Sequence, residues 1–246
     1  INMKGKKVIV TGGSTGIGRE VVKTFAENDA KIAIFDVNNE EGMNLTNELN
    51  KKNSDIRYWN VDVRDANQVS GGVLAATQWL EGIDILINLA GVLQGASIEI
   101  DEFPDEIWDS VISINLTGSY LMSKHIASIM QKQKSGTIIL TSSGAGVLGS
   151  SSSFAYGSSK GGVHGLSLVL EDKLSKYGIR VHDILPGSVN TPLKNAQIET
   201  TRDLTGNEEE YSDTKKILAD PRGVANIIYF MCSEEASILR GSVRTA

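Results

Sequence analysis

The chain has 246 residues, of which 40% are hydrophobic and 22% are charged, and its formal net charge is −6. This composition is typical of a globular protein with a buried core and argues against an intrinsically disordered chain. The acidic balance and the scattered lysines and arginines provide no basic surface for a nucleic acid, so we expect no such partner.

Cys232 is the one cysteine of the chain and therefore has no partner for an intrachain disulfide. It has no companion at metal-ligand spacing, and three scattered histidines suggest no cluster, so we expect no metal site. No apolar run approaches the roughly 18 residues that span a bilayer, and the start of the chain has no signal-peptide segment. We expect a cytoplasmic protein without a membrane partner, and we expect residues 1–2, before Met3, to be a remnant of expression.

Short apolar runs alternate with helix-length amphipathic stretches along the chain. The expected strands are residues 7–11, 31–36, 56–61, 83–89, 136–141 and 179–185. The expected helices are about residues 16–27, 40–53, 65–80, 105–134, 155–177 and 221–232. Because the strands are almost continuously apolar, we expect them to be buried on both faces of a parallel sheet with right-handed crossovers. The predicted fold is α/β, a single doubly wound parallel sheet of the Rossmann type with helices on both faces.

The chain shows no internal repeat and no linker, so we expect residues 1–246 to form one domain. The longest stretch without clear periodicity is 190–216, which is polar and carries three glutamates at 208–210. We expect this stretch to be a mobile lid over the substrate. The alternative, a solvated surface loop without a role, stays open because charge runs usually face water.

A glycine-rich turn follows the first strand directly. Residues 11–18 read T-G-G-S-T-G-I-G, and a helical stretch follows. Glycines let the backbone approach a pyrophosphate, and the free N–H groups of a helix N-terminus favour its charge. The spacing differs from the G-x-G-x-x-G pattern of the commonest dinucleotide site, so a plain tight turn remains an alternative.

The second strand ends at Asp36, eighteen residues after Gly18. A carboxylate there can accept hydrogen bonds from adenosine ribose hydroxyls, and it repels a ribose 2′-phosphate. Thr15, Val37 and Asn38 provide no cation that would hold such a phosphate. The predicted cofactor is therefore NAD rather than NADP, and the alternative is that Asp36 only ends the strand.

Tyr156 and Lys160 lie four residues apart at the start of an expected helix, so their side chains share one face. A tyrosine, with an unperturbed pKa of about 10, needs a nearby positive charge to exchange a proton with an alcohol near neutral pH. Lys160 is placed to supply that charge. Ser143 follows the fifth strand, at the sheet edge that binds ligands in open α/β folds, although position alone does not separate it from Ser142.

Together these residues resemble the short-chain dehydrogenase/reductase family, whose ordinary short members share a T-G-x-x-x-G-x-G turn and a Ser, Tyr-x-x-x-Lys set. The resemblance covers nearly the whole chain. Residues 11–18 match the turn in full, and residues 88–91 match an N-N-A-G element except at Leu89. Pro186-Gly187 with Thr191 matches a P-G segment near the nicotinamide.

The resemblance implies a role for each matched residue. Ser143 would hold the substrate oxygen, Tyr156 would transfer the proton, and Lys160 would bind the nicotinamide ribose while lowering the tyrosine pKa. Asn115 would hold a water in the proton relay. The residues implied to bind the cofactor are Gly12, Ser14, Thr15, Gly16, Ile17, Gly18, Asp36, Asp62, Val63, Asn88, Ala90, Gly91, Tyr156, Lys160, Pro186, Gly187, Val189 and Thr191.

Structural alternatives stay open at three of these positions. Asn115 could cap or bend a helix, Pro186 could end a strand, and Asp62 could cap the following helix. The chain also departs from the family pattern at its end, because it stops soon after Gly241 without the usual V-D-G-G tail. The last strand, if present, is therefore expected to be short.

We expect a homo-oligomer, either a dimer or a tetramer. The short C-terminal end weakens the family's usual tetramer as an expectation, whereas a dimer through the helices expected over 105–134 and 155–177 remains favoured. His182 replaces an asparagine of the family and is most simply a core or sheet residue.

The resemblance predicts an NAD-dependent oxidoreductase that interconverts a secondary alcohol and a ketone by hydride transfer. The residues expected to line its substrate pocket are Gln94, Ala145, Phe154 and Leu193. The polar residues in this region favour a small-molecule alcohol or ketone such as a sugar or polyol.

Two other functions stay open. The first is a 3-oxoacyl thioester reductase, which would more naturally use NADPH, and Asp36 argues against it. The second is a catalytically silent NAD-binding sensor or scaffold, and the intact set of Ser143, Tyr156 and Lys160 argues against it.

Overall fold

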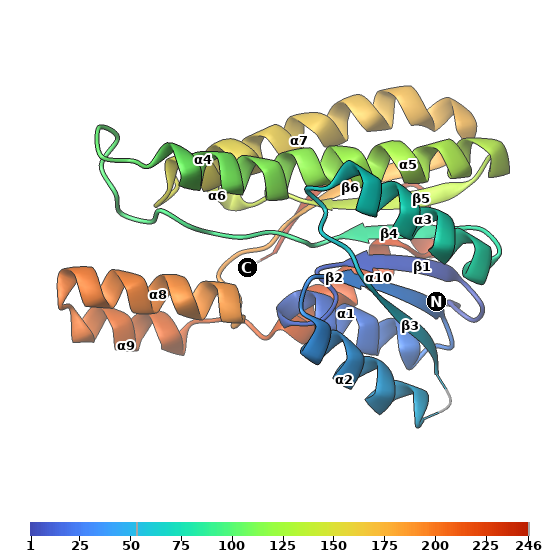
Figure 1. The fold of residues 1–246 in the computed structure, drawn as a ribbon, viewed down its shortest axis with the longest axis horizontal. Coiled ribbons are helices and arrows are strands. Elements are labelled where there is room, and N and C mark those ends of the chain that lie inside the picture. The colour runs from blue at the N-terminus through green and yellow to red at the C-terminus, as the bar shows by residue number, and fades with distance from the viewer. Residues whose placement is uncertain (53, 246) are drawn as a thin grey trace.

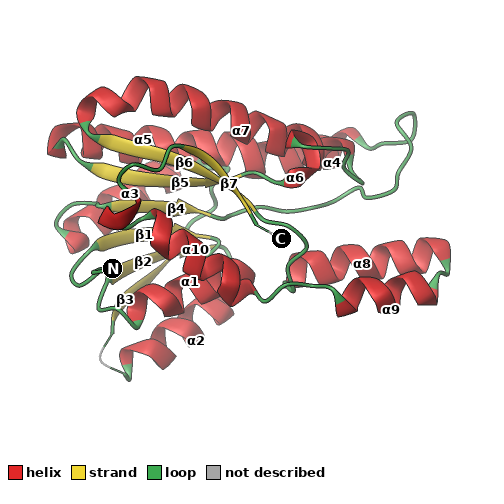
Figure 2. Cartoon of the chain, turned by 180° about the vertical axis from the view of Figure 1, so that it is seen from behind, coloured by secondary structure: helices red, strands yellow, loops and turns green. Residues whose placement is uncertain are grey.

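A seven-stranded parallel sheet forms the centre of the computed structural model, which describes residues 1–52 and 54–245. The strands follow the order β3-β2-β1-β4-β5-β6-β7, and helices cover both faces (Figures 1 and 2). The strands are β1 Lys7–Thr11, β2 Lys31–Asp36, β3 Asp55–Asn60, β4 Ile85–Asn88, β5 Gly136–Thr141, β6 Ile179–Leu185 and β7 Gly241–Arg244. This topology confirms the predicted doubly wound fold.

β1, β2, β5 and β6 have the expected bounds, whereas β3 lies one residue earlier and β4 is shorter at both ends. β7 is short, as expected, and it pairs in parallel with β6. The expectation of burial on both faces is wrong for β3. This strand lies at the edge of the sheet, and Asp55, Arg57 and Asn60 are exposed.

Apolar layers pack against both faces of the sheet. Neighbouring residues of β2 point to opposite sides, so Ile34 lies in one layer and Phe35 in the other. The helices of the first layer are α1 Gly16–Ala26, α2 Asn39–Asn50 and α10 Pro221–Met231. The helices on the opposite side are α3 Ala66–Leu80, α4 Asp105–Ile112, α5 Gly118–Gln133 and α7 Phe154–Leu174.

Short helical turns complete the fold. They are α6 Gly144–Val147 and the 3₁₀ turns Ser175–Tyr177 and Glu234–Ala236. The expected end of the second helix at residue 53 lies outside the described residues. Within the part of the chain that the structure describes, no helix has the length and apolar character required to cross a membrane.

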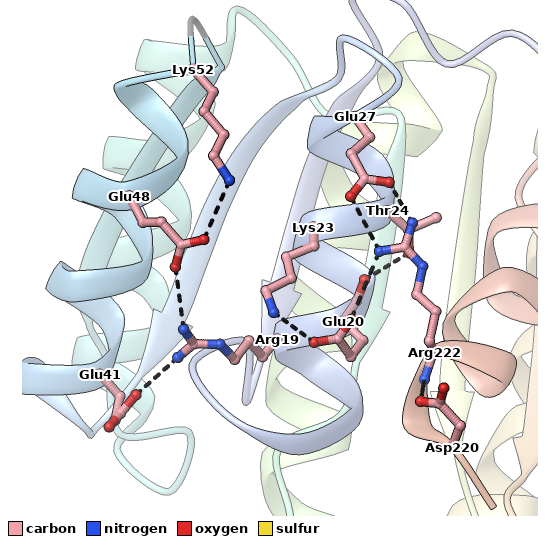
Figure 3. Close-up of polar contacts among 10 residues, drawn as sticks. All are labelled: Arg19, Glu20, Lys23, Thr24, Glu27, Glu41, Glu48, Lys52, Asp220 and Arg222. Atoms are coloured by element: carbon pink, nitrogen blue, oxygen red, sulfur yellow. Dashed lines mark hydrogen bonds and ion pairs between the residues drawn. The ribbon is translucent and has the colours of Figure 1, made fainter.

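Ion pairs tie α1 to its neighbours α2 and α10 (Figure 3). Arg19 of α1 lies 2.9 Å from Glu41 and 3.4 Å from Glu48, both on α2. On the other side of α1, Arg222 of α10 pairs with Glu27. Such partly exposed pairs add little stability, but they constrain the orientation of α1, whose N-terminus follows the glycine turn.

The long helix expected over 105–134 contains an irregularity. α4 continues into a five-residue π-helical segment, Ser113–Thr117, and then into α5. A π turn inserts an extra residue into the helical ladder, and such segments are frequent at functional sites. Asn115, one of the predicted site residues, lies in the middle of this segment.

The stretch 190–216, expected to be without regular structure, contains two helices, α8 Pro192–Thr205 and α9 Glu208–Lys216. They form a hairpin that projects from the body of the molecule (Figures 1 and 2). Ile198 is the buried residue of α8, so the helix has no apolar stripe that a sequence pattern could reveal. The role of this hairpin as a lid stays a prediction.

Candidate active site

A cavity of about 810 Å³ opens at the carboxyl edge of the sheet. Its walls come from the segments that follow β1 to β6 and from the start of α8. It spans the boundary between β1 and β4, where the strand order reverses and where open α/β sheets bind ligands. Its volume falls within the range of roughly 300 to 1,000 Å³ that is typical of ligand pockets.

The cavity brings together most of the predicted site residues. Those in its lining are Gly12, Thr15, Gly16, Ile17, Gly18, Asp36, Asp62, Val63, Ala90, Gly91, Gln94, Ser143, Ala145, Tyr156, Lys160, Pro186, Gly187, Val189, Thr191 and Leu193. Those outside its lining are Ser14, Asn88, Asn115 and Phe154. Phe154 instead packs edge-on against Phe103, with ring centres 5.7 Å apart, and it is partly exposed to solvent. The structure therefore does not group Phe154 with the other predicted substrate residues.

The glycine turn between β1 and α1 forms one wall of the cavity. Gly12 has a φ of 63°, and a Cβ atom there would lie 2.8 Å from the backbone nitrogen of Ala90. A Cβ atom at Gly18 would lie 2.0 Å from the carbonyl oxygen of Gly12. Side chains are therefore excluded, and the bare backbone at the start of α1 is open to an anionic ligand.

Asp36, at the end of β2, lines the cavity beside this turn. Its Oδ2 accepts a hydrogen bond from the backbone nitrogen of Ser14 at 3.0 Å, and its Oδ1 accepts one from Asn38 at 3.0 Å. These contacts fix the carboxylate at the wall. Ser14 contributes its backbone N–H, whereas its side chain is buried, which explains its absence from the lining.

Arg64 also lines the cavity, although nothing in the sequence motifs marked it. Its Nε and Nη2 donate to the carboxylate of Asp62 at 2.6 to 3.0 Å. The hydrogen bonds from Arg64 hold the pKa of Asp62 below its usual range. The signal that could have revealed Arg64 is its position two residues after Asp62, which is one of the predicted cofactor residues.

Asn88 ends β4 and supports the cavity wall from a buried position. Thr11 Oγ1 donates to Asn88 Oδ1 at 2.8 Å, and Asn88 Nδ2 donates to Ser119 Oγ at 2.8 Å. The backbone nitrogens of Leu89 and Ala90 donate to Thr11 Oγ1 in turn. Asn88 thus helps to fix the segment that carries the cavity residues after β4.

Asn115 connects the π-helical segment to its surroundings. Its Oδ1 accepts a hydrogen bond from the Val92 nitrogen at 2.8 Å, and its Nδ2 donates to the Val92 carbonyl oxygen at 3.0 Å. Nδ2 also donates to Ser159 Oγ on α7 at 3.0 Å. The side chain therefore clamps the segment after β4 against the residue that precedes Lys160, and its contact with a relay water stays a prediction.

Tyr156 and Lys160 lie one turn apart on α7, as their spacing predicts. Lys160 is buried, with its Nζ 5.6 Å from the centre of the Tyr156 ring and 2.8 Å from the carbonyl oxygen of Thr141, to which it donates. The Ser143 side chain makes a hydrogen bond with Tyr156. A phenol, a serine hydroxyl and a buried ammonium group thus meet at one point of the cavity.

Burial governs the protonation of this group. Burial raises the pKa of Tyr156, and the hydrogen bond with Ser143 only partly opposes that shift. The expectation that the tyrosine pKa is lowered is therefore wrong. Removing water from around the phenolate raises this pKa more than the hydrogen bond with Ser143 lowers it. Burial also lowers the pKa of Lys160 to about 8, against the opposing effect of the Asp183 charge.

A second polar wall comes from the first turns of α8. Lys194 and Gln197 line the cavity there, and Lys194 Nζ donates to Gln197 Oε1 at 2.8 Å. Burial lowers the pKa of Lys194. Neither residue was predicted as part of the site. The segment was not expected to be helical, and only a helix places residues 194 and 197 on one face.

His182 is buried in β6, and burial lowers its pKa to about 4, which confirms its prediction as a sheet residue. Across residues 1–52 and 54–245, no group of three or more histidine, cysteine, aspartate or glutamate side chains is placed to hold a metal ion.

The arrangement suits proton transfer at an oxygen atom of a small molecule. The phenol can donate a proton to such an oxygen or accept one from it, and the neighbouring serine hydroxyl can hold the same oxygen. The glycine turn and the Asp36 carboxylate suit the phosphates and ribose hydroxyls of a nucleotide.

Comparisons with known proteins agree with this geometry. A family model described as short chain dehydrogenase matches residues 6–202. (+)-Borneol dehydrogenase 1 of Salvia officinalis is 32% identical over 239 residues, which cover 97% of this chain and 91% of that protein. The structure of levodione reductase is 27% identical with a TM-score of 0.93, covering 99% of this chain and 96% of the other. A structure of NAD⁺-bound xylitol dehydrogenase is 26% identical with a TM-score of 0.92, covering 100% and 99% of the two chains.

Proposed function

Because the chain belongs to the short-chain dehydrogenase family, we propose that it interconverts a secondary alcohol and a ketone with NAD. The matched relatives are oxidoreductases that act on CH–OH groups. The observation that carries this proposal is the meeting of Ser143, Tyr156 and Lys160 in a cavity that also holds the glycine turn. The bound nicotinamide would supply hydride transfer, while the protein supplies orientation and handles the proton.

Tyr156 is the acid/base in this proposal. Its raised pKa keeps the phenol protonated near neutral pH, so it can donate a proton to a carbonyl oxygen in reduction. In oxidation the phenolate accepts the hydroxyl proton, and the charge of Lys160 favours that phenolate. Ser143 holds the substrate oxygen, and Asn115 holds a water that links the site to solvent.

The residues around the cavity support NAD rather than NADP. The Asp36 carboxylate lies at the wall, where it accepts hydrogen bonds from ribose hydroxyls and repels a 2′-phosphate. Two neighbouring arginines are already engaged: Arg19 by two glutamates of α2 (Figure 3), and Arg64 by Asp62. A 2′-phosphate would have to disrupt one of these pairs to gain a cation.

The substrate we propose is a small hydroxylated compound such as a sugar or polyol. Gln94, Gln197 and the serines at 150–152 give the cavity several neutral hydrogen-bonding groups. Such groups match the donors and acceptors of a polyol better than a purely apolar ligand. The fold similarity to a xylitol dehydrogenase supports the same class.

The test is NADH formation, followed by absorbance, across polyols, sugars, hydroxy acids and secondary alcohols, with NAD and NADP compared. We expect turnover with NAD, and we expect Tyr156→Phe to reduce it by about 10² or more, because the proton donor is lost. NADH affinity, measured by fluorescence titration, should be nearly unchanged in this variant. Tyr177→Phe, which removes a hydroxyl beyond the far end of α7, is the matched control and should leave turnover unchanged.

Other outcomes would contradict the proposal. Retention of even about a tenth of the rate in Tyr156→Phe would exclude the acid/base role. A clear preference for NADPH would favour a 3-oxoacyl thioester reductase. Tight NADH binding without turnover of any compound would favour a silent sensor or scaffold.

A further inference from the structure

Asp183 carries a buried carboxylate that takes no part in the proton transfer proposed above. It lies in β6, flanked by His182 and Ile184, and its side chain is completely buried. Removing a carboxylate from water costs several kcal/mol unless hydrogen bonds and opposite charges compensate. Its position therefore calls for identified partners.

Three hydrogen bonds hold the Asp183 carboxylate. Its Oδ1 accepts from the backbone nitrogen of Ser142 at 2.9 Å, and its Oδ2 accepts from the Ser142 hydroxyl at 2.6 Å. Oδ2 also lies 2.9 Å from His164 Nδ1 on α7. Ser142 directly precedes Ser143, so Asp183 anchors the backbone that carries the serine of the active site.

The same backbone segment also holds Lys160. Lys160 Nζ donates to the carbonyl oxygen of Thr141, the residue before Ser142. Asp183 therefore anchors Ser142. This residue lies between Thr141, whose carbonyl oxygen accepts from Lys160, and Ser143. Lys160 and His164 are four residues apart, so both side chains lie on one face of α7.

Asp183 supplies the negative charge that opposes the effect of burial on Lys160. The titratable groups that face this region are Tyr156 and His164 from α7 and Asp183 from β6. The segment after β4 and the π-helical segment present the neutral groups of Gly91 and Asn115. Among the described residues that face Lys160, Asp183 is thus the acidic group that can compensate the ammonium.

We propose that Asp183 is a positioning residue for the active site: it fixes the segment that carries Ser143 and the acceptor of the Lys160 ammonium, and it places a buried counter-charge in that network. The inference rests on the proposed function for its catalytic meaning. The charge balance between Asp183 and Lys160 can be measured without any substrate.

The first experiment is an NMR titration of the ε-carbon of Lys160, with its signal assigned by its absence in Lys160→Met. Asp183→Asn removes the charge while preserving the shape of the side chain. We expect the lysine pKa in this variant to fall by about one unit or more, because burial then acts without its opposing charge. An unchanged pKa would overturn the proposal.

Asp84→Asn is the matched control for this titration. Asp84 accepts a hydrogen bond from the Lys7 nitrogen at 2.9 Å at the opposite end of the sheet, so its loss should leave the lysine titration unchanged. A shift of equal size in the control would also overturn the proposal. If Asp183→Asn does not fold, Asp183→Ser removes the same charge with less volume and gives the same readout.

The second experiment uses whichever substrate the NADH assay identifies. Ketone reduction by the wild-type protein should fall as pH rises through about 8, where Lys160 loses its proton. In Asp183→Asn this fall should occur about one pH unit lower, with kcat changing more than the KM for cofactor. An equal loss of kcat at every pH would show a merely structural role.

The two experiments separate this inference from the proposed function. If no compound is turned over but the lysine pKa falls in Asp183→Asn, the charge balance stands and the proposed reaction fails. If turnover is found but neither the titration nor the pH profile moves, the reaction stands and the role of Asp183 fails.

Discussion

The ammonium group of Lys160 serves the proposed reaction at a cost to folding. It is buried, and its pKa is lowered from 10.5 to about 8 because the folded protein removes water from it. Between these two values the folded protein binds fewer protons than the unfolded chain, so this group makes stability rise with pH in that window. Below pH 8 the whole penalty for the charge is present.

Replacing both charges, in the double variant Lys160→Met with Asp183→Asn, should therefore stabilise the protein while it damages activity. At pH 7 we expect the free energy of unfolding to rise by about 1–3 kcal/mol, since a shift of one pKa unit corresponds to about 1.4 kcal/mol. The gain should shrink as pH rises above 8, because the wild-type lysine then becomes neutral. Urea unfolding at pH 7 and pH 9.5 measures both effects, with the exposed Lys176→Met as control. A gain independent of pH would show that packing, and not charge, is responsible.

Two glycines that look alike in sequence should respond oppositely to alanine. Gly18→Ala should destabilise the protein by more than about 2 kcal/mol, because its Cβ would meet the Gly12 carbonyl oxygen. Gly71→Ala, inside α3 with no atom within 4 Å of its Cβ, should stabilise by about 0.5–1 kcal/mol through helix propensity. Thermal unfolding of both variants checks this, and equal effects would contradict the tight turn.

The residues of the candidate site differ in how well the sequence predicts them. Tyr156 and Lys160 stand in a recognisable pattern on one helix, so both could be predicted to share a site. Asp183 could not, because its partners Ser142 and His164 are 41 and 19 positions away and only the fold brings them together. The upward shift of the tyrosine pKa was also missed, since burial cannot be read from spacing.

The helices and strands also differ in how well the sequence predicts them. Buried strands such as β5 and β6 have apolar runs that end where the strand ends, so their bounds could be predicted. α8 and α9 were missed because a helix with one buried position has no amphipathic pattern. The π-helical segment was also missed, since nothing in an apolar periodicity reveals one extra residue in a turn.

The α8–α9 hairpin should be among the least protected parts of the molecule. Few of its residues are buried, so we expect its amide hydrogens to exchange at least about tenfold faster than those of α10, a helix of similar length packed on the core. Hydrogen exchange followed by mass spectrometry measures this. If the hairpin is a lid, NADH and substrate should slow exchange in α8. Exchange that is unaffected by both would identify a solvated surface hairpin.

At the scale of the whole molecule, the helical layer that contains α7 carries several exposed apolar side chains. They are Trp108 on α4, Tyr120 on α5, and Leu168 and Val169 on α7. Large exposed apolar groups that lie together are typical of protein–protein interfaces. The dimer expected through these long helices stays a prediction.

Paired substitution of Leu168 and Val169 by arginine tests this assembly. We expect the double variant to shift to a smaller species in size-exclusion chromatography with light scattering, because burying two charges in an apolar interface is strongly unfavourable. Leu74→Arg, at an equally exposed apolar position on α3, is the control and should leave the assembly unchanged. A wild-type protein that elutes as a monomer would contradict the proposed homo-oligomer.

The order of the strands divides the molecule into two working halves. β1, β2 and β3 lead into the glycine turn, Asp36 and Asp62, whereas β5 and β6 carry the anchors of the proton-transfer residues. In the proposed function, the boundary between β1 and β4 would therefore separate the choice of nucleotide from the chemistry performed with it. If the proposed roles hold, the protein is modular, and we expect that its coenzyme half can be redesigned as one unit while the reaction in the other half is retained.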